Sequence, residues 1–247
     1  MLRTLNQLTG FNLVATDDEI GRCKDFLFDD RNWVLRYMVA DTHKWLPGGR
    51  KVLISPIALQ APDWDNSRLG VNLSRQDIES SPPLDEQAPV SRQYEIYYSK
   101  HFNYNYYWIG PDLWGNFPYP APLLETEVLK DQAQAKPQED SLRSINEVNG
   151  YNIQASDESI GHVEDYVINE DNWSVAYLVV DTRNWLPGGR NVLISPEWLK
   201  AVSWADRCVY VDLTAQQIKD SPEYHPQDQI DDVYETQLRE HYGRHKP

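Results

Sequence analysis

The sequence WLPGGRKVLISP at residues 45–56 recurs almost unchanged as WLPGGRNVLISP at residues 185–196. With the same offset of 140 residues the flanking sequence aligns without a gap, and 34 of the 77 positions from Asn6 to Pro82 are identical to their counterparts. Similarity sustained at one fixed offset indicates a repeated structural unit. The sequence therefore predicts two copies of one domain, called here the first and second repeats.

The repeats divide the chain into three parts. We expect the first repeat to span residues 1–102 and the second to span residues 141–247, with an unmatched segment at residues 103–140 between them. The beginning of this segment is rich in Tyr, Trp and Phe, whereas residues 125–140 are polar and charged, which is typical of a linker. Each repeat is expected to hold a complete set of strands and to fold by itself.

The apolar pattern of each repeat predicts short strands joined by polar turns. In the first repeat these strands are expected near residues 11–15, 20–28, 33–39, 52–54 and 69–73. Gly21 lies inside the second of them, where glycine often marks a bulge or a bend. Several short strands in a small domain are typical of a barrel or a sandwich. The predicted fold class is mainly β, with two tandem small β-barrels, each followed by short helices.

Two helices are predicted in each repeat. Ser74–Asp77 and Thr214–Gln217 resemble capping boxes, in which a hydroxyl and a side chain three residues later bind the free amide groups of a helix start. Apolar residues at helical spacing then predict a second, amphipathic helix near residues 90–98 and near residues 230–241.

Taken in order, the shared glycines, aspartates and strand residues resemble the PRC-barrel domain. The residues that carry the likeness are Gly10-Phe11, Asp17, Ile20-Gly21, Asp25-Phe26, Trp33, Tyr37–Thr42 and Val52–Pro56. In these residues the chain is similar to the cytoplasmic domain of the photosynthetic reaction centre H subunit, to the C-terminal domain of a ribosome-maturation factor and to bacterial proteins with two PRC-barrel copies. The resemblance implies small β-barrels that bind other proteins, and it carries over no catalytic residues.

Composition excludes several classes of function. The chain has 38 Asp and Glu residues against 23 Lys and Arg, a formal net charge of −15. Binding nucleic acid needs clustered basic residues that neutralise phosphates, so we expect no nucleic-acid partner. We also expect no membrane insertion, because no apolar stretch approaches the ~20 residues of a membrane helix. The start of the chain lacks the apolar stretch of a signal peptide, and we expect a cytoplasmic protein.

We expect no metal, no cofactor and no catalytic set. Cys23 and Cys208 have no counterparts in the other repeat and fit no zinc pattern. His241 and His245 stand one helical turn apart but at the end of the chain, where helices fray. Asp41 and Asp181 are expected to anchor the loop that follows each of them.

The repeated loop provides the first candidate binding residues, Trp45, Arg50, Trp185 and Arg190. Trp and Arg are enriched where proteins bind one another. In the alternative interpretation each Trp packs on its own barrel and each Arg pairs with an acidic residue.

The unmatched segment provides the other candidates, Tyr107, Trp108 and Trp114. A flexible linker is usually polar and rich in Gly and Ser, so a segment with this many aromatic residues is not expected to remain free in water. It either packs between the two barrels or forms a docking strip for a partner chain.

Three hypotheses of function follow. The first is a non-catalytic adaptor whose two barrels and aromatic strip bind a protein partner, with self-association left open. The second is an enzyme or small-ligand binder that uses a cleft between the repeats. The third is a ribosome-maturation type of factor that binds a ribosomal protein. The shared residues are turn glycines, apolar residues and Trp, which favours the adaptor.

Overall fold

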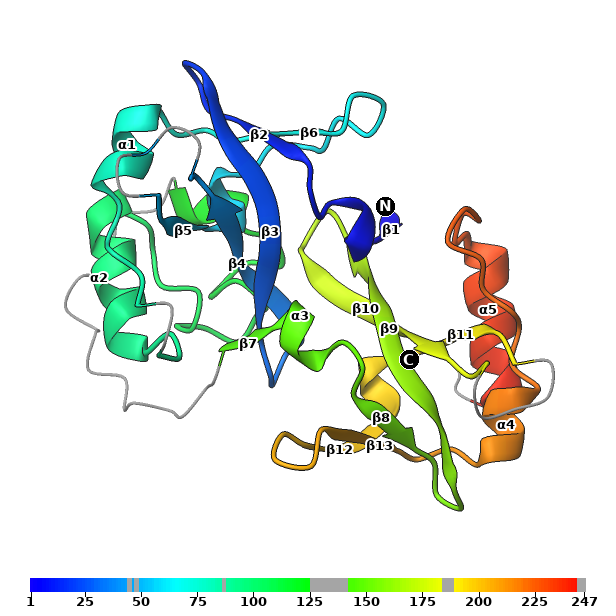
Figure 1. The fold of residues 1–247 in the computed structure, drawn as a ribbon. Helices are drawn as coiled ribbons and strands as arrows, with labels where there is room; N and C mark the ends of the chain where they lie inside the picture. The colour runs from blue at the N-terminus through cyan, green and yellow to red at the C-terminus, as the bar shows by residue number, and fades with distance from the viewer. Residues whose placement is uncertain (44–45, 47–48, 86–87, 125–141, 184–188, 244–247) are drawn as a thin grey trace. The chain divides into compact units, whose positions relative to one another are not determined.

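The computed structural model describes residues 1–43, 46, 49–85, 88–124, 142–183 and 189–243 (Figure 1). The prediction of a mainly β protein is confirmed, and the strands form a curled half-barrel sheet. Over the described residues, no helix is long and apolar enough to cross a membrane.

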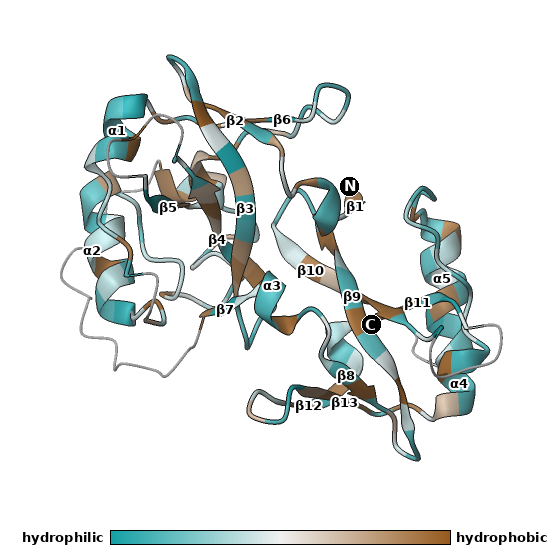
Figure 2. Ribbon diagram, viewed as in Figure 1, coloured by the Kyte–Doolittle hydropathy of each residue, from teal (hydrophilic) through white to brown (hydrophobic). Residues whose placement is uncertain are grey.

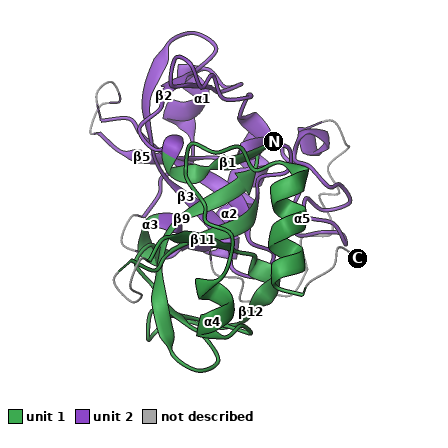
Figure 3. Ribbon diagram, turned by 90° about the vertical axis from the view of Figure 1, so that its right-hand side faces the viewer, with its two compact units in different colours: residues 1–6, 146–169, 175–247 green, residues 7–145, 170–174 purple. Residues whose placement is uncertain are grey.

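The chain forms two compact units, coloured separately in Figure 3. Unit 2 comprises residues 7–145 and 170–174, and unit 1 comprises residues 1–6, 146–169 and 175–247. Each unit is therefore built mainly from one repeat but also includes a short piece of the other.

In unit 2 the long strand β3 is central. It pairs antiparallel with β2, β4 and β7, while β2 also pairs parallel with β6 and β4 pairs antiparallel with β5. The strands are β2 (Asn12–Val14), β3 (Glu19–Asp29), β4 (Val34–Asp41), β5 (Lys51–Ile54), β6 (Arg68–Gly70) and β7 (Leu142–Ser144). The helices are η2 (Pro56–Ala58), α1 (Arg75–Ser80), α2 (Arg92–Phe102) and η3 (Ala121–Leu124), and η1 (Leu5–Gln7) precedes β2.

In unit 1 the strand β9 has the corresponding central place. It pairs antiparallel with β8 and with β1, β8 pairs parallel with β13, and β10 pairs antiparallel with β11. The strands are β1 (Leu2–Thr4), β8 (Asn152–Gln154), β9 (Ser159–Asn169), β10 (Ser174–Asp181), β11 (Asn191–Ile194), β12 (Leu199–Ser203) and β13 (Cys208–Val211). The helices are α3 (Ile145–Val148), η5 (Pro196–Trp198), α4 (Ala215–Lys219) and α5 (Asp232–His241).

The core of unit 2 centres on β4. Every residue from Val34 to Ala40 is buried, so both faces of this strand are covered. Figure 2 shows the same concentration of hydrophobic residues on β4 and β5. Trp33, Leu35, Tyr37 and Val39 alternate with their neighbours in the sequence, which predicts one solvated face, but the structure corrects this because both faces are covered.

Glycine is required where β3 passes close to β4. A Cβ atom at Gly21 would overlap the carbonyl oxygen of Asp41, and Gly21 has a φ of +126°. The pairing of β2 with β3 shifts register beside this residue, which confirms the predicted bulge. Trp33 also differs from the prediction, since it lies in the β3–β4 turn with a φ of 54° and β4 starts after it.

The predicted helix starts are confirmed in both units. Ser74 and Thr214 each form a complete capping box, with Asp77 and Gln217 as the reciprocal side chains. The second helices also form, as α2 and α5.

One expectation is corrected, namely that each repeat holds a complete set of strands. The first strand of the first repeat, β1, pairs with β9 of the second repeat. The first strand of the second repeat, β7, pairs with β3 of the first repeat. The two repeats have exchanged their N-terminal strands, so a fragment that starts at residue 141 would lack β1.

Candidate functional site

The aromatic segment (residues 104–124) folds onto the first repeat inside unit 2. It starts where α2 ends, with the amide of Tyr104 donating to the carbonyl of Ser99 over 2.8 Å. The side chains of Tyr104, Tyr106, Trp114 and Leu123 are buried. The segment is therefore an ordered part of unit 2.

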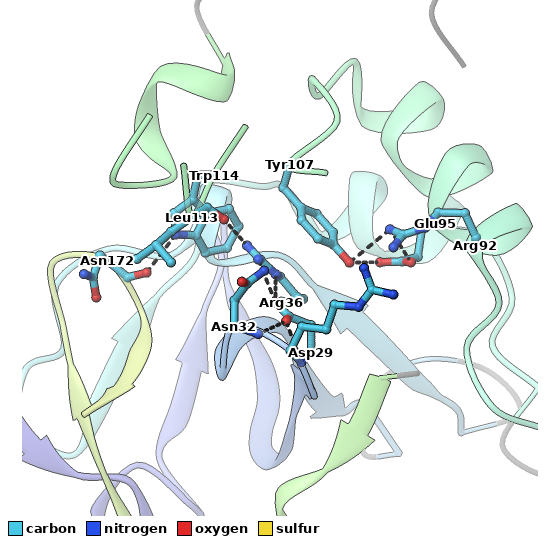
Figure 4. A network of polar contacts seen from close by, with 10 residues as sticks. Asp29, Asn32, Arg36, Arg92, Glu95, Tyr107, Leu113, Trp114 and Asn172 are labelled. Carbon is cyan, nitrogen blue, oxygen red and sulfur yellow. Dashed lines mark hydrogen bonds and ion pairs between the residues drawn. The ribbon is translucent and has the colours of Figure 1, made fainter. Parts of the chain in front are cut away.

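A buried ion pair lies beneath the segment (Figure 4). Arg36 projects from β4 and is only 2% exposed. Its Nε donates to Oδ2 of Asp29 over 2.7 Å, and its Nη2 lies 2.6 Å from the same oxygen. The other oxygen of Asp29 accepts the amide of Asn32 at 2.6 Å. Both charges are thus neutralised and hydrogen-bonded, as a buried pair requires.

Two rings of the aromatic segment cover the Arg36 guanidinium. Its carbon lies 3.9 Å from the ring centre of Tyr107 and 4.8 Å from that of Trp114, which is cation–π geometry. Nη1 of Arg36 also donates to the carbonyl of Leu113 over 2.6 Å. Arg36 therefore holds the segment through its charge, its hydrogen bonds and its stacking.

Trp114 extends these contacts to the tip of the β9–β10 hairpin. This tip, residues 170–174, comes from the second repeat but belongs to unit 2. The Trp114 indole donates from Nε1 to the carbonyl of Asn172 over 2.7 Å. Nearby, the amide of Leu35 donates to the carbonyl of Trp173 over 2.8 Å.

A second buried carboxylate lies on α2. Glu95 is 1% exposed; its Oε2 lies 2.9 Å from Nη1 of Arg92, and its Oε1 accepts the hydroxyl of Tyr107 at 2.7 Å. Burial raises the pKa of Glu95, whereas the Arg92 guanidinium and the Tyr107 hydroxyl oppose that rise. Arg92 in turn stacks on Trp108, 4.2 Å from its ring centre. Tyr107 therefore joins the two ion pairs into one network, with its ring on Arg36 and its hydroxyl on Glu95.

This network has no equivalent in the second repeat. Ala176 stands where the first repeat has Arg36, and Asn169 stands where it has Asp29. The counterpart of Glu95 is Glu235, which accepts the hydroxyl of Tyr177 over 2.6 Å. Sequence reasoning missed Asp29, Arg36, Arg92 and Glu95. Two signals in the sequence could have revealed the network. Arg36 stands within the otherwise apolar sequence of β4, and the second repeat lacks both this arginine and its acidic partner Asp29.

The structure places the three candidates of the segment at different depths. Trp114 is fully buried, so it belongs to the core of unit 2 and is not available at the surface. Tyr107 and Trp108 are half-buried, and their rings cover Arg36 and Arg92 respectively. These three residues therefore pack within unit 2, on the first repeat.

Exposed apolar side chains remain on the outer part of the segment. Tyr119 and Leu124 are each 48% exposed, and Phe117 is half-buried. Tyr97 on the neighbouring helix α2 is also exposed. We call Tyr119 and Leu124 the exposed apolar pair.

The arginines of the repeated loops bind the ends of short helices. The Arg50 guanidinium donates to the carbonyls of Glu79 and Ser81 at the end of α1. Arg190 donates from Nη2 to the carbonyl of Lys219 at the end of α4 over 2.9 Å. Arg190 also lies 3.9 Å from Oε2 of Glu223, the acidic pairing expected of it, whereas the described hydrogen bonds of Arg50 cap free helix carbonyls. Trp45 and Trp185 lie outside the described residues, as does the polar stretch 125–140.

The aspartates expected to anchor these loops do so. Asp41 accepts the amide of His43 at 3.1 Å, and Asp181 accepts the amide of Arg183 at 2.7 Å. The hydrogen bonds from Arg183 lower the pKa of Asp181. These contacts fix the start of each loop.

The arrangement is suited to holding chain segments together. Asp29 and Glu95 each have a cationic partner and at least one further hydrogen-bond donor. A general acid or base must instead reach a substrate proton. Among the described residues, no group of three or more His, Cys, Asp or Glu side chains is placed to hold a metal ion.

Comparison with known proteins bears on the second repeat. A search of curated proteins found no match to this chain. The comparison with family models found one domain, whose match extends from β7 to α4. Residues 141–218 match the PRC-barrel domain.

Proposed function

We propose that this protein is a non-catalytic interaction module, built of two PRC-barrel repeats, that binds a protein partner through the exposed apolar pair of its aromatic segment. The match of residues 141–218 to the PRC-barrel domain supports the barrel assignment of the second repeat. The sequence repeat extends that assignment to the first. Resemblance to the reaction centre H subunit adds a cytoplasmic, protein-binding role as part of the same proposal.

The observation that carries the proposal is the aromatic segment itself. It is the part of the described chain without a counterpart in the other repeat, and it is fixed by the buried charges of Arg36 and Glu95. Such anchoring lowers the conformational entropy that a binding surface loses on association. The segment still exposes Tyr119, and tyrosine is among the residues that carry binding energy at interfaces. An anchored segment that exposes a tyrosine and a leucine suits protein recognition.

The test compares two double variants of the full chain. Tyr119→Ser with Leu124→Ser removes the exposed apolar pair, whereas Tyr210→Ser with Val233→Ser removes two exposed apolar side chains from unit 1. Wild type and each variant are immobilised on a resin and incubated with native cell extract. The proteins that each resin retains are then quantified by mass spectrometry. A partner found with wild type is then purified for calorimetry.

Loss of an interface Tyr commonly costs about 2 kcal/mol, so the first variant should bind that partner about 30-fold more weakly. The control variant should bind as wild type does, and both should keep the wild-type melting temperature. Equal binding by both variants would contradict the proposed surface.

A further inference from the structure

A buried carboxyl group binds the N-terminal end of the chain to β9. Asp165 of β9 is 6% exposed, and its Oδ1 accepts two backbone amides, that of Tyr166 at 2.7 Å and that of Asn6 at 3.1 Å. The side chain of Asn6 also donates to this carboxyl group. Asn6 follows β1 and is the last of the six N-terminal residues that belong to unit 1. Asp165 therefore holds β1 at the point where the chain leaves unit 1.

The surroundings of Asp165 are buried and polar but do not neutralise a negative charge. Nearby, the buried hydroxyl groups of Thr4 and Tyr224 lie 2.8 Å apart, and Tyr224 is close enough to Asp165 to interact with it. In the described part of the chain the donors to Asp165 are amides, and no ion pair reaches it. The titratable groups on the elements around it are Glu164 and His162 on β9, Arg3 on β1, Asp181 on β10, Lys219 on α4, and Tyr224 and Asp228 after α4.

This geometry accepts a protonated carboxyl group more readily than an ionised one. Burying an ionised carboxylate without a cation is costly, whereas its neutral form needs only hydrogen-bond partners. Burial raises the pKa of Asp165 to about 7; the amides of Tyr166 and Asn6 oppose that rise, and the charge of Glu164 adds to it. Because both backbone amides bind Oδ1, a proton on Oδ2 leaves both hydrogen bonds intact.

The strand that Asp165 holds is short and terminal. β1 has three residues, and the preceding Met1 is 64% exposed. Chain ends are common places for local opening that does not unfold the whole domain. The burial of Leu5 and Leu8 opposes such opening, so β1 stays attached in most molecules. Release of residues 1–6 removes the amide of Asn6 from Asp165 and admits water to the carboxyl group.

From these contacts we propose that Asp165 makes the attachment of β1 to β9 sensitive to pH. When the carboxyl group gives its proton to solvent, the attachment weakens and β1 opens more often; when a proton returns, the attachment is restored. The proton acts as the ligand of this equilibrium, because it binds the attached form more tightly than the open form. The proposal does not depend on the aromatic segment or on its partner.

The sign and size of the effect follow from proton linkage. The pKa of Asp165 is about 7 with β1 attached, whereas an aspartate in water titrates near 4. Protonation therefore stabilises the attached form fully below pH 4, and this contribution is lost as the pH rises through 7. Between pH 6 and pH 8 the equilibrium constant for opening of β1 should rise about tenfold.

The first repeat provides a matched control at Asp25, the counterpart of Asp165. Asp25 is only half-buried and accepts the hydroxyl of Ser144, in β7, at 2.5 Å. Leu84 stands where the second repeat has Tyr224. Asp25→Asn therefore makes the same chemical change at the attachment of β7 and leaves that of β1 unaltered.

Hydrogen exchange of the full chain at pH 6, 7 and 8 tests the proposal. Mass spectrometry of a peptide covering residues 1–8 gives protection factors for β1, corrected for the intrinsic exchange rate at each pH. Wild type is compared with Asp165→Asn, which keeps an oxygen acceptor but does not titrate, and with Asp25→Asn. Denaturant titration at each pH gives the free energy of global unfolding, which separates local opening from unfolding of the whole chain.

We expect the protection factor of residues 1–8 to fall about tenfold from pH 6 to pH 8 in wild type and in Asp25→Asn, and to stay constant in Asp165→Asn. An equal fall in all three proteins, or no fall in wild type, would overturn the proposal. Protection of residues 1–8 that matches global unfolding at every pH would also overturn it, because β1 would then have no opening of its own.

Discussion

The two repeats cover the same face of their sheets in different ways. In the first repeat η2 carries the small Ala58, α2 carries the large Tyr98, and Tyr104 of the aromatic segment packs beside Tyr98. In the second repeat η5 carries Trp198, and α5 carries the smaller Leu238 at the position of Tyr98. The Trp198 ring packs 4.8 Å from that of Tyr242. The large residue is therefore on the long helix α2 in the first repeat and on the short helix η5 in the second.

The two repeats also differ in their buried charges. The first repeat keeps Arg36 and Asp29 and uses them to hold the aromatic segment, whereas the second has Ala176 and Asn169. Loss of both charges together avoids a buried charge without a partner, which is strongly destabilising. We conclude that one sheet scaffold is completed by an added segment in one copy and by its own side chains in the other.

The largest effect is expected from Trp114→Ala. Deleting a fully buried aromatic side chain costs about 3–5 kcal/mol, and this change also removes the hydrogen bond to the Asn172 carbonyl. The free energy of unfolding, measured by denaturant titration, should fall by that amount. Trp108→Ala is the matched control, since Trp108 is only half-buried and should cost less. Equal losses would show that the segment is not anchored at Trp114.

The next effect concerns pH and Asp165 of β9, which accepts the amide of Asn6 just after the exchanged strand β1. Burial raises the pKa of Asp165 to about 7, although the amides of Tyr166 and Asn6 lower it. A carboxyl whose pKa is raised on folding stabilises the fold most below its unfolded pKa, near 4, and loses that contribution as pH rises toward 7. As the pH rises from 5 to 8, the free energy of unfolding of Asp165→Asn should therefore increase by about 2–3 kcal/mol relative to that of wild type.

Asp181→Asn is the control for this titration. The pKa of Asp181 is lowered, so its carboxyl is ionised throughout this range and the difference from wild type should stay constant with pH. Chemical denaturation at several pH values measures both variants. A pH-independent difference for Asp165→Asn would contradict a raised pKa at that site.

Much of each repeat follows from local sequence. The capping boxes at Ser74 and Thr214 need only side chains three residues apart, so a pattern identifies them. Gly21 is likewise recognisable inside its strand. Such features depend on neighbours along the chain.

The candidate site depends on contacts between distant residues, and the sequence alone did not reveal it. Arg36 bonds to Leu113, and Trp114 bonds to Asn172, over separations that no periodicity records. The exchange of β1 and β7 was missed for the same reason, because a strand of three residues has the same pattern whichever partner it pairs with.

The most direct test of the central claim is a double-mutant cycle on Arg36 and Asp29, using the residues of the second repeat. Arg36→Ala alone should cost about 3–5 kcal/mol, because it leaves a buried carboxylate without its partner. Adding Asp29→Asn to that variant should restore about 2 kcal/mol or more of the free energy of unfolding. If the double variant instead loses the sum of the two single losses, the pair does not act as one unit and the account of the two repeats is contradicted.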